Sequence, residues 1–375
     1  MNLLEWAETE LELIKKKHRW RNLSPPCGID LSSNDYLGLS THPILIQKFI
    51  EGIQTYGVGS TASRLIRGHR DIFEKAEEEF SNWIEGESAL FLANGFLANL
   101  GLMDVLGSIP SKFFCDRLNH ASILDGIRLS GAEVKYYKHR NYEDLENLLK
   151  RESYGTAKVI VSETVFSMDG DLADLVKLIE LKKKYNACLV LDEAHALGVF
   201  GKQGEGLSKH VEINLNEIDF RVFTCGKALG LEGAFIVCSK KVKQLLINKL
   251  RTFIFSTAPI PAIAYAVCTA IELVKEMQEE RKKIFYLSNF FREQLKFLGL
   301  DCLDSNSQII PILTGDEANT MELATKLQTS GFDIRGIRPP TVKKSRLRVS
   351  INSKLNQTDL EKVIEILKSF SRPLI

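Results

Sequence analysis

Short apolar runs alternate with helix-length segments through the first two thirds of the chain, and this pattern constrains the fold most. Ala89–Leu92 precedes a helical pattern over Gly95–Leu106. Val159–Val161 precedes a loop and a helical pattern over Leu172–Tyr185, which Cys188–Leu191 follows directly. The series continues with Phe220–Thr224 and Ala234–Cys238. This alternation predicts an α/β fold with a mostly parallel sheet that helices cover on both faces.

The pattern changes after Pro259 and Pro261. A helical pattern over Ala262–Leu298 is apolar on one face and rich in Lys and Glu on the other. Short strands and helices then follow, at Gln308–Leu313, Thr320–Ser330, Arg346–Ile351 and Thr358–Phe370. These elements predict a smaller α+β domain. We expect an N-terminal segment over residues 1–45 that begins with an amphipathic helix, a large domain over 46–270 and a small C-terminal domain over 271–375.

Charge and cysteine content exclude several classes of protein. The net charge of +1 over 375 residues gives no general attraction to nucleic acid or to an anionic membrane. The seven cysteines form no CxxC pair, which favours reduced thiols in the cytoplasm over disulfides or a metal site. We find neither a signal-peptide pattern nor an apolar run of about 18 residues, so we expect no membrane span.

Asp192 follows the apolar run Cys188–Leu191 and is therefore expected at the carboxyl end of a buried strand. Ligands of open α/β sheets bind at that edge, although a strand-terminal acid often only caps the next turn. The sequence Asp192–His195 also resembles the DEAH box of nucleotide-driven helicases. The helicase interpretation requires a phosphate loop with a glycine six residues before its lysine. Arg221 stands at that position before Lys227, so we exclude the helicase interpretation.

Lys227 lies in a loop of small residues directly after the apolar run Phe220–Thr224. Most lysines are solvated surface residues. A lysine among apolar neighbours would instead have a lowered pKa and could form an imine with a carbonyl compound. A strand-end lysine beside a strand-end aspartate strengthens this second interpretation.

Other polar segments are weaker candidates for binding. Gly95 and Phe96 begin a helix, where backbone N–H groups and the helix dipole favour an anion. His120 lies in a polar loop and is either structural or stacked on a flat ring. Arg346 and Arg348 alternate along one strand, so they share a face that is either solvated or binds a carboxylate.

Several of these segments occur together in one known family. The chain resembles the α-oxoamine synthases, which are fold-type I pyridoxal-phosphate (PLP) enzymes, from about Ser33 to Ile366. The motifs that carry the resemblance are Ser33–Leu39, Phe166–Asp171, Asp192–His195, Thr224–Gly230 and Arg346–Arg348. The resemblance implies a fold-type I PLP-dependent transferase, a PLP cofactor, a homodimer and an N-terminal segment that packs on the small domain.

The resemblance also implies roles for residues at the cofactor. Lys227 would bind PLP through an imine and act as general base, Asp192 would pair with the pyridine nitrogen, and His120 would stack on the ring. The ring hydroxyl would contact Ser167 and His195. The phosphate would be bound by Gly95, Phe96 and Thr224, with Thr257 donated by the partner subunit.

Substrate contacts follow from the same resemblance. Arg348, helped by Asn34, would bind the amino-acid carboxylate. Arg19 belongs to the basic run Lys15–Arg21, which either meets the acyl chain or its carrier or is simply a solvated helix face.

The segment Ile337–Val342 resembles the branch of the family that joins L-alanine to a pimeloyl thioester in biotin biosynthesis. The carrier of the acyl group, CoA or acyl carrier protein, stays open. One alternative is a synthase that uses glycine or serine with another acyl-CoA, such as a glycine C-acetyltransferase. A second alternative is a non-catalytic regulatory subunit with the same fold, which would lack the reactive lysine; Lys227, Asp192 and His120 are all present.

Overall fold

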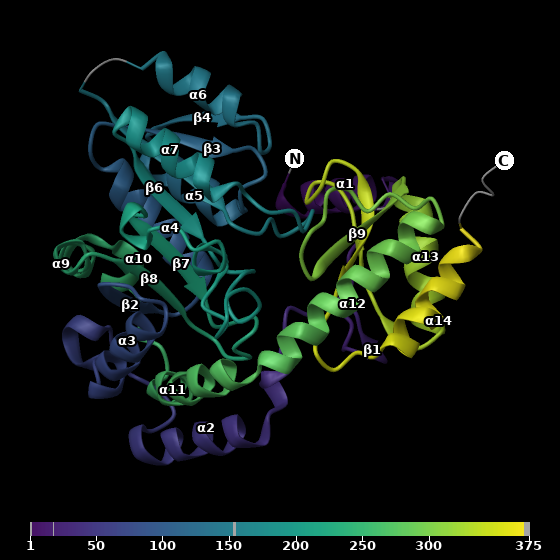
Figure 1. Ribbon diagram of the computed structural model, residues 1–375, viewed down its shortest axis with the longest axis horizontal. Helices are drawn as coiled ribbons and strands as arrows, with labels where there is room; N and C mark the ends of the chain where they lie inside the picture. The colour runs from purple at the N-terminus through teal and green to yellow at the C-terminus, as the bar shows by residue number, and fades with distance from the viewer. Residues whose placement is uncertain (1, 18, 153–154, 371–375) are drawn as a thin grey trace. The chain divides into compact units, whose positions relative to one another are not determined.

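The computed structural model describes residues 2–17, 19–152 and 155–370 of the chain (Figure 1). Its residues form two compact units. The large unit comprises Asn34–Ser167 and Leu172–Lys282. The small unit comprises Met1–Ser33, Met168–Asp171 and Lys283–Ile375. The domain boundaries after residues 45 and 270 stay a prediction.

A seven-stranded sheet forms the centre of the large unit, with the strand order β2-β8-β7-β6-β5-β3-β4. The strands are β2 (Ser88–Leu92), β3 (Ser111–Asp116), β4 (Glu133–Tyr137), β5 (Ala157–Glu163), β6 (Cys188–Asp192), β7 (Phe220–Thr224) and β8 (Ala234–Cys238). The pairings from β4 through β7 are parallel, whereas β8 runs antiparallel to both β7 and β2. The mostly parallel sheet expected from the sequence is confirmed.

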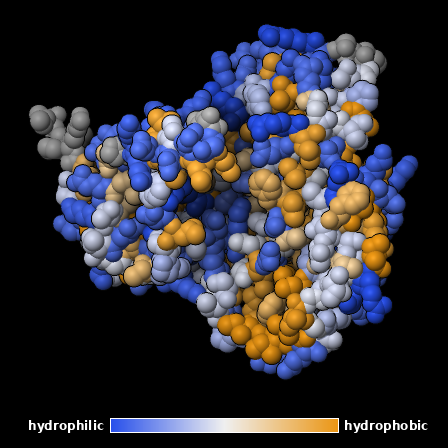
Figure 2. All heavy atoms as spheres, turned by 180° about the vertical axis from the view of Figure 1, so that it is seen from behind, coloured by the Kyte–Doolittle hydropathy of each residue, from blue (hydrophilic) through white to orange (hydrophobic). Residues whose placement is uncertain are grey.

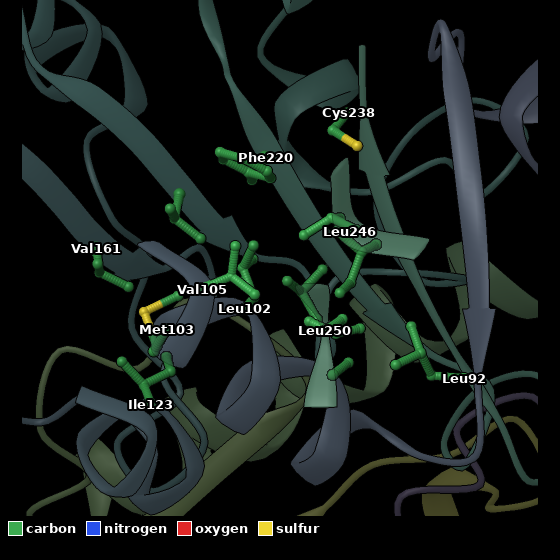
Figure 3. Packing of buried hydrophobic residues seen from close by; sticks show 14 of the residues in the cluster. Leu92, Leu102, Met103, Val105, Ile123, Val161, Phe220, Cys238, Leu246 and Leu250 are labelled. Carbon is green, nitrogen blue, oxygen red and sulfur yellow. The ribbon is translucent and has the colours of Figure 1, made fainter. Parts of the chain in front are cut away.

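Helices pack against both faces of this sheet, whereas α2 packs on α11. The helices of the large unit are α2 (Pro43–Tyr56), α3 (Asp71–Trp83), α4 (Gly95–Gly107), α5 (Ala121–Ser130), α6 (Tyr142–Lys150), α7 (Leu175–Tyr185), α8 (Leu207–His210), α9 (Lys240–Lys249), α10 (Arg251–Ile254) and α11 (Pro261–Glu276). Leu102 and Met103 of α4 pack with Ile123 of α5 and with Val161 of β5 in one apolar core (Figure 3).

Aromatic stacking fills the opposite face of the sheet. The rings of Phe80 on α3 and Phe235 on β8 are parallel, with centroids 3.9 Å apart. Phe223 on β7 meets Phe80 edge-on. Because side chains alternate between the faces of a strand, these phenylalanines lie opposite Val222 and Ile236 of the α4 core. Burial on both faces explains the apolar runs within the central strands, such as Val159–Val161 of β5 and Leu189–Leu191 of β6.

The small unit contains a three-stranded antiparallel sheet with the order β11-β12-β9 and a separate pair, β1-β10. Its strands are β1 (Ile29–Asp30), β9 (Ile309–Gly315), β10 (Phe332–Asp333), β11 (Gly336–Ile337) and β12 (Ser345–Ser350). Its helices include α1 (Leu3–Lys16), α13 (Glu317–Thr329) and α14 (Gln357–Lys368). The parallel pairing of Ile29 with Phe332 joins the N-terminal segment to this unit.

The single helix expected over Ala262–Leu298 is wrong, because the chain forms α11 and then α12 (Gln278–Phe297). The backbone leaves the helical conformation at Met277, with φ −83° and ψ 47°. The guanidinium of Arg281 donates to the carbonyl oxygens of Val274 and Lys275 and thereby satisfies the end of α11. A side-chain cap of this kind leaves no mark in the hydrophobic periodicity.

The helix expected over Leu172–Tyr185 begins later, at Leu175. Leu172 forms a β-bridge with Val165, and Asp174 caps the helix by accepting from the Lys177 N–H at 3.0 Å. Across the described ranges, no helix has both the length and the apolar character needed to cross a membrane.

Candidate active site

The carboxyl ends of β6 and β7 bring the two strongest sequence candidates to one edge of the sheet. Asp192 is the last residue of β6, and Lys227 follows the end of β7 at Thr224. The two strands are parallel neighbours, with Asp192 in register with Val222. Asp192 is buried and Lys227 is half-buried. Topology therefore places an acid and an amine at the edge where ligands of such sheets bind.

The Asp192 carboxylate is held by two hydrogen bonds. Asn99 Nδ2 donates to Asp192 Oδ2 at 2.7 Å, and the Ala194 backbone N–H donates to Oδ1 at 2.9 Å. Asn99 lies on α4 and is buried. Charge-assisted bonds of this length fix the orientation of a carboxylate and offset the cost of burying it. The remaining lone pairs can accept a proton from a ligand.

His120 caps the start of α5. The Ser122 backbone N–H donates to His120 Nδ1 at 3.3 Å, and Ser122 Oγ lies 2.8 Å from the same nitrogen. Nδ1 therefore acts as an acceptor, which leaves the proton of the neutral ring on Nε2. Asn99 Nδ2 also donates to Ser122 Oγ at 3.1 Å. A chain of hydrogen bonds thus runs from the His120 ring through Ser122 and Asn99 to Asp192.

Electrostatics connect the same groups. Burial lowers the pKa of His120; the charge of Asp192 opposes this shift, and that of Lys227 adds to it. His120 is accordingly neutral at pH 7 although its side chain remains accessible to solvent. Because both charges act on one imidazole, the side chains of Asp192, Lys227 and His120 share one site.

The start of α4 offers a site for an anion. Asn94 caps the helix by accepting from the Leu97 N–H at 3.0 Å, and the helix begins at Gly95 and Phe96. A Cβ atom added to Gly95 would lie 3.4 Å from Thr224 Cβ and 3.5 Å from its Oγ1. Gly95 therefore packs closely against the end of β7. The first-turn N–H groups and the Thr224 hydroxyl form a cradle suited to a phosphate.

A second polar cluster contains His195 and Asn34. The Tyr36 hydroxyl lies 2.7 Å from His195 Nδ1 and donates to Asn34 Oδ1 at 3.1 Å. Tyr36 is fully buried and His195 is buried. Asn34, expected at the substrate carboxylate, is thereby connected to His195. Tyr36 was not singled out from the sequence, although it lies inside the motif Ser33–Leu39.

Ser167 follows β5 at the same edge. It is buried, and its backbone N–H donates to Glu163 Oε2 at 3.2 Å. Thr257 lies in an exposed loop after α10 and lines a small cavity together with Ala93.

The remaining predicted contacts lie in the small unit. Arg348 is buried on β12, where its Nη1 donates to Ser350 Oγ at 2.7 Å. Arg19 forms an ion pair with Glu317 at the start of α13, with 3.4 Å between Nη2 and Oε1. The roles expected for both arginines, and those expected for Thr257 and Ser167, stay predictions.

Sequence reasoning missed Asn99, Ser122 and Glu163. Asn99 stands four residues after Gly95, so a helical pattern would place both at neighbouring positions of α4. Ser122 follows His120 at the spacing of a cap. Glu163 ends β5 in register with Asp192, as a strand-end acid that the pattern applied to Asp192 could have found.

Comparison with known proteins identifies the family. The model of "Aminotransferase class I and II" matches residues 27–367. A Bacillus cereus protein named "Putative 8-amino-7-oxononanoate synthase" is 42% identical over 96% of this chain and 90% of its own.

Solved structures share the fold. An 8-amino-7-oxononanoate synthase from Francisella tularensis is 30% identical, with a TM-score of 0.81, over 91% of this chain and 97% of its own. A structure of serine palmitoyltransferase with PLP is 25% identical, with a TM-score of 0.90, over 99% of this chain and 98% of its own. The chain therefore belongs to the class I and II aminotransferase family of fold-type I PLP enzymes, and within it to the α-oxoamine synthases.

The residues present fit PLP. Asp192 offers a fixed acceptor for a ring N–H, Lys227 offers an amine, and the cradle of Gly95 and Thr224 suits the phosphate. The neutral imidazole of His120 is a planar group at the same site. These groups match the ring nitrogen, the aldehyde and the phosphate of the cofactor.

Asn99→Ala should weaken PLP binding, because Asp192 loses one of the two donors that orient it. A hydrogen bond to a charged group contributes about 1.5–3 kcal/mol, so we expect roughly a 10- to 100-fold rise in Kd. Titration of the apo-protein with PLP, followed by absorbance, measures this Kd. Asn82→Ala on the exposed surface of α3 is the control. Unchanged affinity in Asn99→Ala would remove Asn99 from the site.

Proposed function

We propose that this enzyme joins L-alanine to a pimeloyl thioester and releases 8-amino-7-oxononanoate, carbon dioxide and the free thiol. One structural observation carries the chemistry: Asp192 and Lys227 stand at the carboxyl ends of the neighbouring strands β6 and β7, and a chain of hydrogen bonds connects Asp192 to His120. The choice of substrates rests on the name of the Bacillus cereus relative at 42% identity. The branch-like segment Ile337–Val342 agrees with that name. On this proposal the enzyme works in biotin biosynthesis.

PLP, when bound, supplies an electron sink that stabilises negative charge on the α carbon of the amino acid. Lys227 would hold the cofactor through its amine and would also take the proton from the α carbon of the amino acid as general base. Asp192 would pair with the protonated ring nitrogen, and its bonds from Asn99 and Ala194 hold the carboxylate in one orientation.

The other site residues orient the reactants. His120 would stack on the ring of the cofactor, and as a neutral imidazole it adds no positive charge beside Lys227. Ser167 and His195 would contact the ring hydroxyl, and Gly95, Phe96 and Thr224 would hold the phosphate.

Arg348 and Asn34 bind the substrate carboxylate, and Arg19 contacts the acyl chain or its carrier. The α carbon then bonds to the thioester carbonyl carbon as the C–S bond breaks. The carboxylate of the resulting β-keto acid leaves as carbon dioxide, and a proton returns to the α carbon.

A second candidate is a synthase that uses serine or glycine with another acyl-CoA. The TM-score of 0.90 to serine palmitoyltransferase favours this alternative at the level of the fold. The two candidates share every role assigned to Lys227, Asp192 and His120, and they differ only in the groups that meet the side chain and the acyl tail.

Lys227→Ala should lower kcat by about a thousandfold or more, because both the covalent attachment and the general base are lost. The holoenzyme should show visible absorbance that the variant lacks, and borohydride should fix the cofactor to Lys227 in a peptide map. Lys202→Ala, an exposed lysine of the same unit, is the control. Near-normal turnover in Lys227→Ala would contradict the assigned chemistry.

Mixed-substrate assays separate the two candidates. We expect the amino ketone of alanine and the pimeloyl group to dominate when alanine, glycine and serine compete with pimeloyl-, acetyl- and palmitoyl-CoA. Mass spectrometry of the products identifies both halves at once. Parallel reactions with the pimeloyl group on acyl carrier protein determine the preferred carrier. A dominant glycine or serine product would replace the first candidate by the second.

We also propose a homodimer located in the cytoplasm. The helix α2 exposes Ile44, Ile46 and Ile50, and Figure 2 shows apolar side chains gathered over this helix. Exposed apolar patches of this kind mark association sites. The seven cysteines are free thiols, which agrees with a reducing compartment.

Analytical ultracentrifugation of the holoenzyme should show a dimer. Ile46→Glu should shift the mass toward the monomer, since a charge in an apolar interface is costly. Glu322→Gln, an exposed change on α13, is the control. A wild-type protein that sediments as a monomer at assay concentrations would contradict the dimer.

A further inference from the structure

A second buried carboxyl lies beside Asp192, and the reaction described above does not use it. Glu163 is the last residue of β5, and its register partner on β6 is Asp192. Only 3% of its surface is exposed. Paired residues on neighbouring parallel strands lie about 4.8 Å apart along the sheet, so two acids end adjacent strands at one edge.

The contacts of Glu163 are incomplete for an ionised group. Its Oε2 accepts from the Ser167 backbone N–H at 3.2 Å, and the His120 backbone N–H also donates to the carboxyl. Its Oε1 is buried and makes no hydrogen bond to any residue in the described ranges. An ionised carboxylate can only accept, so a buried oxygen without a donor is costly. A protonated carboxyl carries no charge at that oxygen.

The neighbouring Glu193 shows the opposite arrangement. This carboxylate is also fully buried, but it accepts from the Thr164 hydroxyl at 3.0 Å and from the backbone N–H groups of Leu207 and Ser208 at 2.9 and 3.0 Å. Donors therefore surround both of its oxygens. The contrast indicates that the fold prepares Glu193, but not Glu163, for a negative charge.

Charged groups around Glu163 act in both directions. Burial and these groups together raise the pKa of Glu163 to about 8: burial is the largest cause, the charge of Asp192 on β6 adds to it, and the charge of Lys227 after β7 and the N–H groups of Ser167 and His120 oppose it. The His120 ring is itself neutral at pH 7. The Asn119 side chain, which accepts from the Glu163 N–H at 3.3 Å, carries no charge.

We propose that Glu163 holds a proton at neutral pH and is a positioning residue for the charge of Asp192. With Glu163 neutral, the negative charge at the paired ends of β5 and β6 stays on Asp192. Two ionised carboxyls side by side would repel each other. A second negative charge beside Asp192 would disturb the pairing of its carboxylate with a protonated ring nitrogen. This role rests on the proposed function, because it concerns the carboxylate assigned to the cofactor.

The sign of the pH dependence follows from linkage. Unfolded Glu163 releases its proton near pH 4.5, whereas the folded residue keeps it up to about pH 8. Between these values the folded state binds the extra proton, so the contribution of Glu163 to stability is full below pH 4.5 and falls as the pH rises to about 8. Above pH 8 the proton leaves to solvent, and a second negative charge appears beside Asp192.

Infrared spectroscopy tests the proton directly and needs no turnover. The wild-type protein at pH 7 should show the C=O stretch of a protonated carboxyl, and this band should disappear with a midpoint near pH 8. Glu163→Gln should lack the band. Glu163→Asp, which keeps a carboxyl, should retain a shifted band and serves as the second variant if Glu163→Gln does not fold. A band that is absent from the wild type, or unchanged in Glu163→Gln, would overturn the proposal.

The holoenzyme tests the consequence for the site. Glu163→Gln should keep kcat at pH 7 within about threefold. In the wild type we expect kcat to fall and the visible absorbance to change above pH 8; this alkaline limb of the pH profile should move to higher pH in Glu163→Gln. A merely structural role would leave the alkaline limb in place. Glu193→Gln is the matched control and should lower Tm without moving the limb. An identical alkaline limb in the wild type and Glu163→Gln would overturn the proposal.

The two readouts separate this proposal from the proposed function. If no amino acid and acyl thioester react, the infrared band still reports the proton on Glu163. If Lys227 carries the cofactor but the band is absent, the proposed reaction stands and the role of Glu163 is wrong.

Discussion

A buried negative charge on Asp192 is the constraint around which the site is arranged. Burial of a carboxylate is tolerated only where donors replace water. Asn99 from α4 and the Ala194 N–H supply these donors, and the same Asn99 amide reaches Ser122 beside His120. One helix thus supplies the phosphate cradle at its first turn and the support of the acid one turn later. Packing of α4 on the sheet therefore fixes the positions of both its first turn and Asn99 relative to the strand ends (Figure 3).

Sequence patterns predicted the parts of the fold that depend on local burial. Strands buried on both faces contain continuous apolar runs, so β5, β6 and β7 could be placed within a residue or two. The end of such a strand is visible as the first polar residue, which is how Asp192 was found. The break at Met277 was not predicted, because the cap that the Arg281 guanidinium forms on the end of α11 leaves the apolar periodicity of the segment unchanged.

The residues of the candidate site also fall into two groups, those that sequence patterns reveal and those that only contacts in the folded chain reveal. Lys227, Asp192 and Gly95 stand at strand or helix ends that the sequence reveals. Asn99 and Tyr36 act through contacts with residues far away in the chain, at Asp192 and His195, and only tertiary structure brings them there. Glu163 is an intermediate case: the sequence shows that it ends a strand, but it does not show that its Oε1 lacks a hydrogen-bond partner among the described residues.

The small unit is assembled from three separate stretches of the chain, at its start, at Met168–Asp171 and after Lys282. Its middle stretch follows Ser167 directly and is tied in by an ion pair between Asp169 and Arg346 of β12. A gene fragment that begins at Lys283 would lack Ile29, the partner of Phe332, and would expose the edge of β10. The small unit therefore cannot be excised as one continuous piece, and swapping it between relatives would require exchanging all three stretches together.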